Sequence, residues 1–78
     1  MSKIFICADT FVDAEICAYS KLNFPTTLNW IYVIDESTIK NISNATLYLY
    51  EDWYKKIRNV AKFLSYAQSQ NFTIIKLP

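Results

Sequence analysis

Acidic side chains that follow apolar runs are the residues whose type and position could do chemistry. Asp9, Glu51 and Asp52 come directly after runs with the composition of buried strands. Carboxylates that meet at the carboxyl ends of parallel strands can hold Mg²⁺, a hard cation that takes oxygen ligands. Such a site would support phosphoryl transfer or nucleic-acid processing. Acids at these positions also suit the start of a helix or turn, where capping and the helix dipole favour them, so both interpretations stay open.

Two residue types that enzymes use often are missing from the 78 residues. The chain contains no glycine and no histidine. Glycine-rich loops that bind phosphate need positive backbone φ angles, which glycine adopts at low cost. Histidine is the commonest general base and the commonest ligand of transition metals. We therefore expect a protein that is not an enzyme and that uses no cofactor.

The charges are divided along the chain, although the net charge is only +1. All seven acids lie in residues 1–52, whereas residues 53–78 carry five basic residues and no acid. Lys55, Arg58 and Lys62 recur at i, i+3 and i+7 and, together with Lys56, would form a basic stripe on one helix. This stripe is either a solvated face or a surface that meets phosphates or an acidic protein. Binding of nucleic acid through this helix is a third hypothesis, which the low overall charge does not favour.

The compartment can be inferred from hydropathy and from the cysteines. No apolar run reaches the length of a membrane span, and the first residues do not have the pattern of a secretion signal. Cys7 and Cys17 lie among apolar neighbours and are expected to be free, buried thiols rather than a disulfide or redox pair. We expect a cytoplasmic protein with no membrane partner.

Apolar periodicity predicts a single α/β domain over residues 1–78. A polar connector, Glu36–Asn44, is expected to form one helical turn with Ser37 as its cap and with Ile39 and Ile42 facing the core. The apolar face of the longest predicted helix consists of Trp53, Ile57, Val60, Ala61, Leu64 and Ala67. The expected strands are Lys3–Ala8, Asn29–Ile34, Ala45–Tyr50 and Phe72–Leu77. The expected helices are Phe11–Leu22, with Thr10 as its N-cap and Asp13 in its first turn, and Asp52–Gln70.

The order of these elements predicts a Rossmann-like, mostly parallel sheet of four strands. No hairpin turn separates the strands, so the strands are expected to be parallel. If the second strand lies outside the first and the chain then returns past the first strand, right-handed crossovers give the strand order 2-1-3-4. One helix then covers each face. The two acidic strand ends, Asp9 and Glu51-Asp52, should flank the point where the strand order reverses.

The third strand carries tyrosines on one face and leucines on the other. Tyr48 and Tyr50 share a face, and a first helix of 12 residues is too short to cover four strands. These tyrosines are therefore either core residues or part of a bare aromatic surface. Bare aromatic surface is typical of an interface, so we expect them to contact a partner protein or a second copy of the chain in a homodimer.

The run FVDAEICAYSKLNFPTTLNWIYVID followed by SNATLYLYEDWYKK resembles small Rossmann-like accessory proteins carried by bacteriophages and mobile elements. The resemblance implies a protein that binds and inhibits or modulates a component of the host cell or of a defence complex, as anti-CRISPR proteins do. It favours a non-enzymatic protein-binding function in the cytoplasm of the host. The expected contact residues are Lys55, Arg58, Lys62, Tyr48 and Tyr50. The Mg²⁺-dependent and nucleic-acid-binding alternatives remain as the competing hypotheses.

Overall fold

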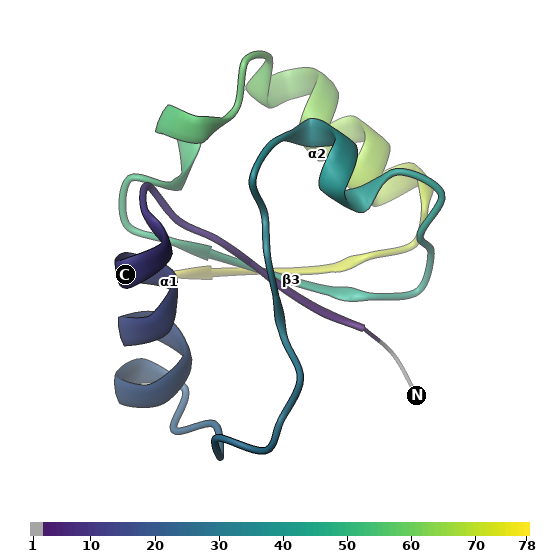
Figure 1. The fold of residues 1–78 in the computed structure, drawn as a ribbon. Coiled ribbons are helices and arrows are strands. Elements are labelled where there is room, and N and C mark those ends of the chain that lie inside the picture. Colours follow the sequence, from purple (N-terminus) through teal and green to yellow (C-terminus); the bar gives the residue numbers. More distant parts are fainter. Residues whose placement is uncertain (1–2) are drawn as a thin grey trace.

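A computed structural model describes residues 3–78 as one parallel four-stranded sheet between helices (Figure 1). The strands are β1 (Ile4–Cys7), β2 (Ile31–Tyr32), β3 (Thr46–Tyr50) and β4 (Thr73–Leu77). Their order is β2-β1-β3-β4, and every neighbouring pair is parallel. The predicted α/β architecture and strand order are confirmed. Strand β2 is shorter than expected, because only Ile31 and Tyr32 pair with β1 as a strand.

One helix lies on each face of the sheet. Helix α1 (Phe11–Ile16) continues directly into a π-helical segment, η1 (Cys17–Lys21), on one face. Helix α2 (Val60–Ser69) lies on the other face, together with the 3₁₀ turn η2 (Glu36–Ile39) (Figure 1). No helix within residues 3–78 is both long enough and apolar enough to cross a membrane.

The start of α1 follows the local sequence. The hydroxyl of Thr10 accepts a hydrogen bond from the backbone N–H of Asp13 at 3.1 Å, so Thr10 is the N-cap as expected. At the other end the backbone N–H of Leu22 bonds the carbonyl of Cys17, a 2.9 Å contact across five residues. The helical segment therefore ends where the sequence predicts, but its second half is wound more loosely than an α-helix.

The single long helix predicted over Asp52–Gln70 is wrong. The segment is divided into a 3₁₀ turn, η3 (Trp53–Lys56), and α2, with extended backbone at Ile57 and Asn59 between them. The carboxamide of Asn59 accepts a hydrogen bond from the N–H of Lys62 at 3.1 Å and so caps α2. Its own backbone N–H donates to the carboxylate of Glu36 at 2.9 Å. The cap at Asn59 starts a new helix at this point, and the spacing of the apolar residues did not reveal it.

The connector between β2 and β3 forms the expected helical turn, although the cap is a different residue. Asp35, not Ser37, is the N-cap, since its carboxylate accepts the backbone N–H of Ser37 at 2.9 Å. Ile39 is fully buried and Ile42 packs against the core, as predicted.

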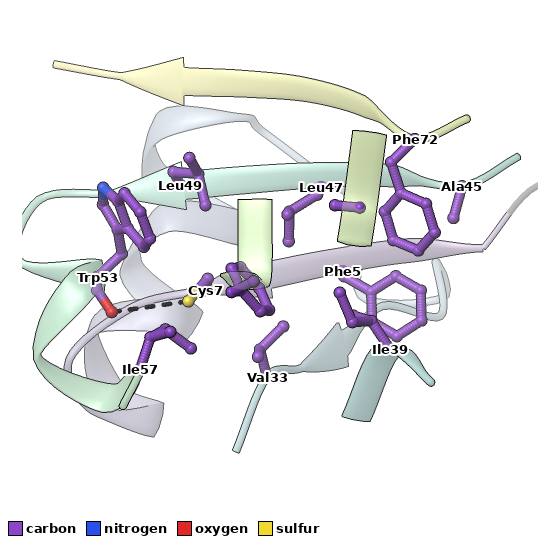
Figure 2. Close-up of a cluster of buried hydrophobic side chains, with 12 residues drawn as sticks. Phe5, Cys7, Val33, Ile39, Ala45, Leu47, Leu49, Trp53, Ile57 and Phe72 are labelled. Atoms are coloured by element: carbon purple, nitrogen blue, oxygen red, sulfur yellow. Dashed lines mark hydrogen bonds between the residues drawn. The ribbon is translucent and has the colours of Figure 1, made fainter. Parts of the chain in front are cut away.

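Two separate clusters of buried side chains lie on the two faces of the sheet. The α2 face is filled by large side chains from β1, β3, η3 and α2, and the thiol of Cys7 donates to the carbonyl of Trp53 at 3.6 Å (Figure 2). The α1 face is built from smaller residues. The buried residues of the α1 face are Ile6, Ala8, Ala14, Cys17, Ala18 and Tyr50.

Asparagine takes over the role of glycine in the tight turns. Five described residues have positive φ, and four of them are asparagines. Asparagine tolerates the left-handed region better than other residues with a side chain. The exception is Glu51, with φ of 48°, at the carboxyl end of β3. The residues with positive φ are Asn23, Asn41, Asn44, Glu51 and Asn71.

Candidate functional site

The carboxyl edge of the sheet gathers charged residues around the ends of β1 and β3. Asp52 pairs with Lys55, with 3.4 Å between the carboxylate oxygen and Nζ. The negative charge of Asp52 raises the pKa of the Lys55 ammonium, and that of Asp9 adds to the effect. Asp9 and Asp52 are therefore brought to one edge, as the sequence predicts.

The carboxylates at this edge are spread out or engaged by neighbouring side chains. Among residues 3–78 no three acidic or thiol side chains come close enough together to hold a metal ion. Both oxygens of Asp52 are engaged, one by Lys55 and the other by the hydroxyl of Tyr54 at 3.4 Å. Glu51 and Asp52 are exposed, and Asp9 is half-buried. The arrangement of Asp52, Tyr54 and Lys55 closes a surface turn.

The two thiols are held in unreactive environments. Cys7 and Cys17 are free and buried, as expected from their apolar neighbours. Burial raises the pKa of the Cys7 thiol to about 12 and that of Cys17 to about 11. Because the thiolate is the nucleophile, neither side chain is suited to attack a substrate near neutral pH.

The expectation that Tyr48 and Tyr50 lie on bare sheet surface is wrong for Tyr50 and only half met for Tyr48. Tyr50 is 3% exposed and belongs to the cluster under α1. Tyr48 is half-buried and meets the ring of Phe24 edge to face, with 5.9 Å between ring centroids. The segment after η1 covers the part of the sheet that a short helix leaves open. Whether Tyr48 contacts a partner stays a prediction.

The predicted basic stripe is not a single surface, because the helix that would carry it is broken. Lys55 is ion-paired on η3, whereas Arg58 lies in the extended link before α2. Lys62 follows in the first turn of α2. Arg58 and Lys62 instead face η2, where they line two hollows with Lys56, which the predicted stripe included, and with Lys40, which it did not.

A groove of about 320 Å³ lies between η2 and the link from η3 to α2. A second hollow of about 110 Å³ lies beside it between η2 and α2, and the two share Glu36 and Lys40. We call these two adjacent hollows together the basic groove. Its cations are Lys40, Lys56, Arg58 and Lys62. None of these four takes part in an ion pair within residues 3–78.

The two acids that line the basic groove are occupied by internal hydrogen bonds. The carboxylate of Asp35 accepts the hydroxyl and the backbone N–H of Ser37, and these bonds lower the pKa of Asp35. The carboxylate of Glu36 accepts the backbone N–H of Asn59. The groove has four cations against these two acids, so it offers net positive charge to an anionic group.

A second surface, which the sequence did not predict as a contact site, lies on the outer side of α1. Val12, Phe11 and Ile16 are 61%, 52% and 42% exposed. The ring of Phe11 stacks on Trp30 with 5.9 Å between centroids. The indole N–H of Trp30 in turn donates to the hydroxyl of Tyr19 at 3.1 Å. The signal for this surface was in the sequence, because apolar residues occur on every side of the predicted helix.

No known protein family matches the chain, and a search of curated proteins and of solved structures likewise gives no match.

Proposed function

We propose that this protein is a non-enzymatic binding domain that docks an acidic segment of a partner protein in the basic groove. The observation that carries the proposal is that four cations that form no ion pair within residues 3–78 line the basic groove, namely Lys40, Lys56, Arg58 and Lys62. Unpaired cations in a groove attract an acidic segment and fix its orientation. Arg58 can bind a carboxylate with two parallel hydrogen bonds.

The shape of the groove favours a side chain or a short loop over a nucleic-acid duplex. The groove is hollowed between η2 and the start of α2, and acidic residues line it beside the cations. Duplex DNA is bound by surfaces that neutralise several phosphates along an extended basic face. The chain has a net charge of only +1, which also supports a protein partner.

The class of partner comes from the resemblance to small proteins carried by bacteriophages. On that basis the proposal extends to a component of the host cell or of a defence complex, which this protein would inhibit or modulate in the cytoplasm. The contact residues expected from the sequence, Arg58 and Lys62, are part of the groove, and Lys55 lies beside it in η3.

Affinity capture from the infected host, followed by binding measurements with the captured protein, tests the proposal. The double variant Lys56→Glu with Arg58→Glu should bind at least about ten-fold more weakly, a change of about 1.4 kcal/mol. Its melting temperature should hardly change, because exposed charges contribute little to stability.

Lys3→Glu is the matched control, because Lys3 is an exposed lysine at the amino end of β1, at the opposite end of the sheet. If this control weakens binding as much as the groove variant does, the effect is general electrostatics and the groove is not the site. Tight binding to duplex DNA with a steep salt dependence would favour the nucleic-acid hypothesis instead.

A further inference from the structure

The segment formed by α1 and η1 is apolar on both of its sides. The side toward the sheet consists of small residues, Ala14, Cys17 and Ala18, all fully buried. The larger apolar residues Val12 and Ile16 point away from the sheet and are well exposed. A helix that is apolar all round is normally covered on all sides, whereas a surface helix has a polar outer face. The outer face of this segment therefore lacks a cover from the part of the chain that the structure describes.

The winding of the segment decides which residues share this outer face. In the α-helical half, Val12 and Ile16 lie one turn apart on the outside. The π-helical half takes more residues per turn, as the bond from Leu22 to Cys17 shows. The next residue on the outside is therefore Ser20, while Tyr19 is turned toward Trp30. The outermost stripe is Val12, Ile16 and Ser20.

The same winding gives the stripe two different flanks. The flank toward β2 carries Phe11 and Tyr19, which both pack on Trp30. The opposite flank carries an acid near its beginning, Asp13, and a base at its end, Lys21. The charged flank is thus negative at one end of the segment and positive at the other.

We propose that the outer face of α1 and η1 binds a second copy of this chain, with the two segments antiparallel about a two-fold axis at Ile16. A two-fold axis across the interface places the charged flank of one copy beside the charged flank of the other, in the opposite direction. Asp13 of one copy then faces Lys21 of the partner subunit, and the pair occurs twice. Their positions differ by two residues along the axis, about 3 Å at 1.5 Å per residue, which a lysine side chain spans easily.

The apolar part of the contact suits a weak dimer. Whole aromatic side chains bury about 150–250 Å², so four large side chains that are roughly half exposed offer on the order of 300–400 Å² per copy. Stable interfaces bury about 1,200–2,000 Å² in total, and weaker, transient ones bury less. We expect association in the micromolar range or weaker. The four side chains are Phe11, Val12, Ile16 and Tyr19.

Sedimentation equilibrium from micromolar to millimolar protein tests this dimer. The wild-type protein should associate, and Ile16→Glu should remain monomeric with its fold retained by circular dichroism. A wild-type protein that is monomeric at millimolar concentration overturns the proposal, as does Ile16→Glu that associates like the wild type. Lys62→Glu, a charge change on α2, is the matched control and should leave the association unchanged.

Exchanging the charges of Asp13 and Lys21 tests whether the partner on this face is a second copy of the chain or a different protein. Asp13→Lys and Lys21→Asp should each weaken association about ten-fold, because each turns two attractive contacts into repulsive ones. The double variant Asp13→Lys with Lys21→Asp should recover most of the affinity. If the double variant stays as weak as the single ones, the antiparallel pairing is wrong. A face that binds a different protein would show no such recovery.

Glu15 provides a further check on the register. It lies one residue from the proposed axis, on the flank of Phe11 and Tyr19, so the two copies would place like charges near each other. Glu15→Gln should therefore strengthen association, and a weaker dimer would contradict the antiparallel register. These measurements use a surface on the opposite face of the sheet from the basic groove. A failure here leaves the proposed binding in the groove untouched, and the reverse also holds.

Discussion

The two faces of the sheet are covered in opposite ways. On the α2 face the large side chains point inward, and three helical elements, η2, η3 and α2, surround them (Figure 2). On the α1 face one helical segment approaches the sheet closely through alanines and a cysteine, and its large side chains point outward. The difference teaches that three helical elements complete the cover of one face, whereas the single segment on the other face is still apolar on its outside. The α2 face accounts for most of the buried core, and the outer side of α1 is available for contact.

The largest expected difference between the faces is the cost of removing a large side chain. Phe63→Ala on α2 should lower the free energy of unfolding by about 3–5 kcal/mol, because Phe63 is buried between α2 and the sheet. Val12→Ala on the outside of α1 should lower it by less than about 1 kcal/mol. Urea denaturation at low protein concentration, where the chain is monomeric, measures both. Equal losses would mean that Val12 belongs to a core within one chain.

The pH dependence of stability compares the two faces through their buried thiols, Cys7 on the α2 face and Cys17 on the α1 face. Both native pKa values are raised by burial, so above about pH 8.5, the pKa of an exposed thiol, the unfolded chain loses protons that the folded chain keeps. The unfolded state then binds fewer protons, and stability falls as pH rises, by up to about 1.4 kcal/mol per pH unit for a thiol that stays protonated. This loss continues to about pH 11 for Cys17 and to about pH 12 for Cys7.

Urea denaturation at several pH values between 8.5 and 10 checks this prediction. The quantity compared is the slope of the free energy of unfolding against pH, not its absolute value. Cys7→Ala and Cys17→Ala should each reduce the slope of stability against pH, whatever they do to stability at neutral pH. An unchanged slope in Cys17→Ala would show that the α1 face admits water to the thiol.

The close approach of α1 to the sheet can be tested by adding volume. Ala18→Leu should destabilise the fold by about 1–3 kcal/mol, because Ala18 is fully buried against the sheet and overpacking displaces the helix. Ser20→Leu, which adds the same side chain on the exposed side, should change stability by less than about 0.5 kcal/mol. Thermal melting compares the two, and a tolerated Ala18→Leu would contradict the tight packing of this face.

The smallest expected effects concern the two N-caps, which have the same geometry on the two faces. Thr10 and Asn59 each accept a backbone N–H three residues later at 3.1 Å. Thr10→Ala and Asn59→Ala should each cost about 1 kcal/mol. Amide hydrogen exchange should show faster exchange throughout α1 in Thr10→Ala, because nothing within residues 3–78 covers the outer side of α1. Slow exchange in α1 would mean that the segment is held more firmly than its contacts suggest.

Local patterns in the sequence determined the order of the elements, the parallel sheet and the cap of α1. Short apolar runs separated by helical periods allow few topologies, and right-handed crossovers select the strand order that is observed. The position of Thr10 before an acidic first turn was enough to locate the start of α1. The gathering of Asp9 and Asp52 at one edge also followed from this topology.

Tertiary contacts decided the rest, because they couple residues that are distant in sequence. At the break before α2, Glu36, 23 residues earlier, accepts the backbone N–H of Asn59, in addition to the local cap that Asn59 supplies. The break leaves Arg58 and Lys62 beside Lys40 rather than on one helical stripe. The burial of Tyr50 and the partial cover of Tyr48 depend on α1 and on Phe24, which no periodicity relates to β3. Periodicity shows which residues are apolar on a helix, whereas only the packed structure shows which of its sides faces the sheet.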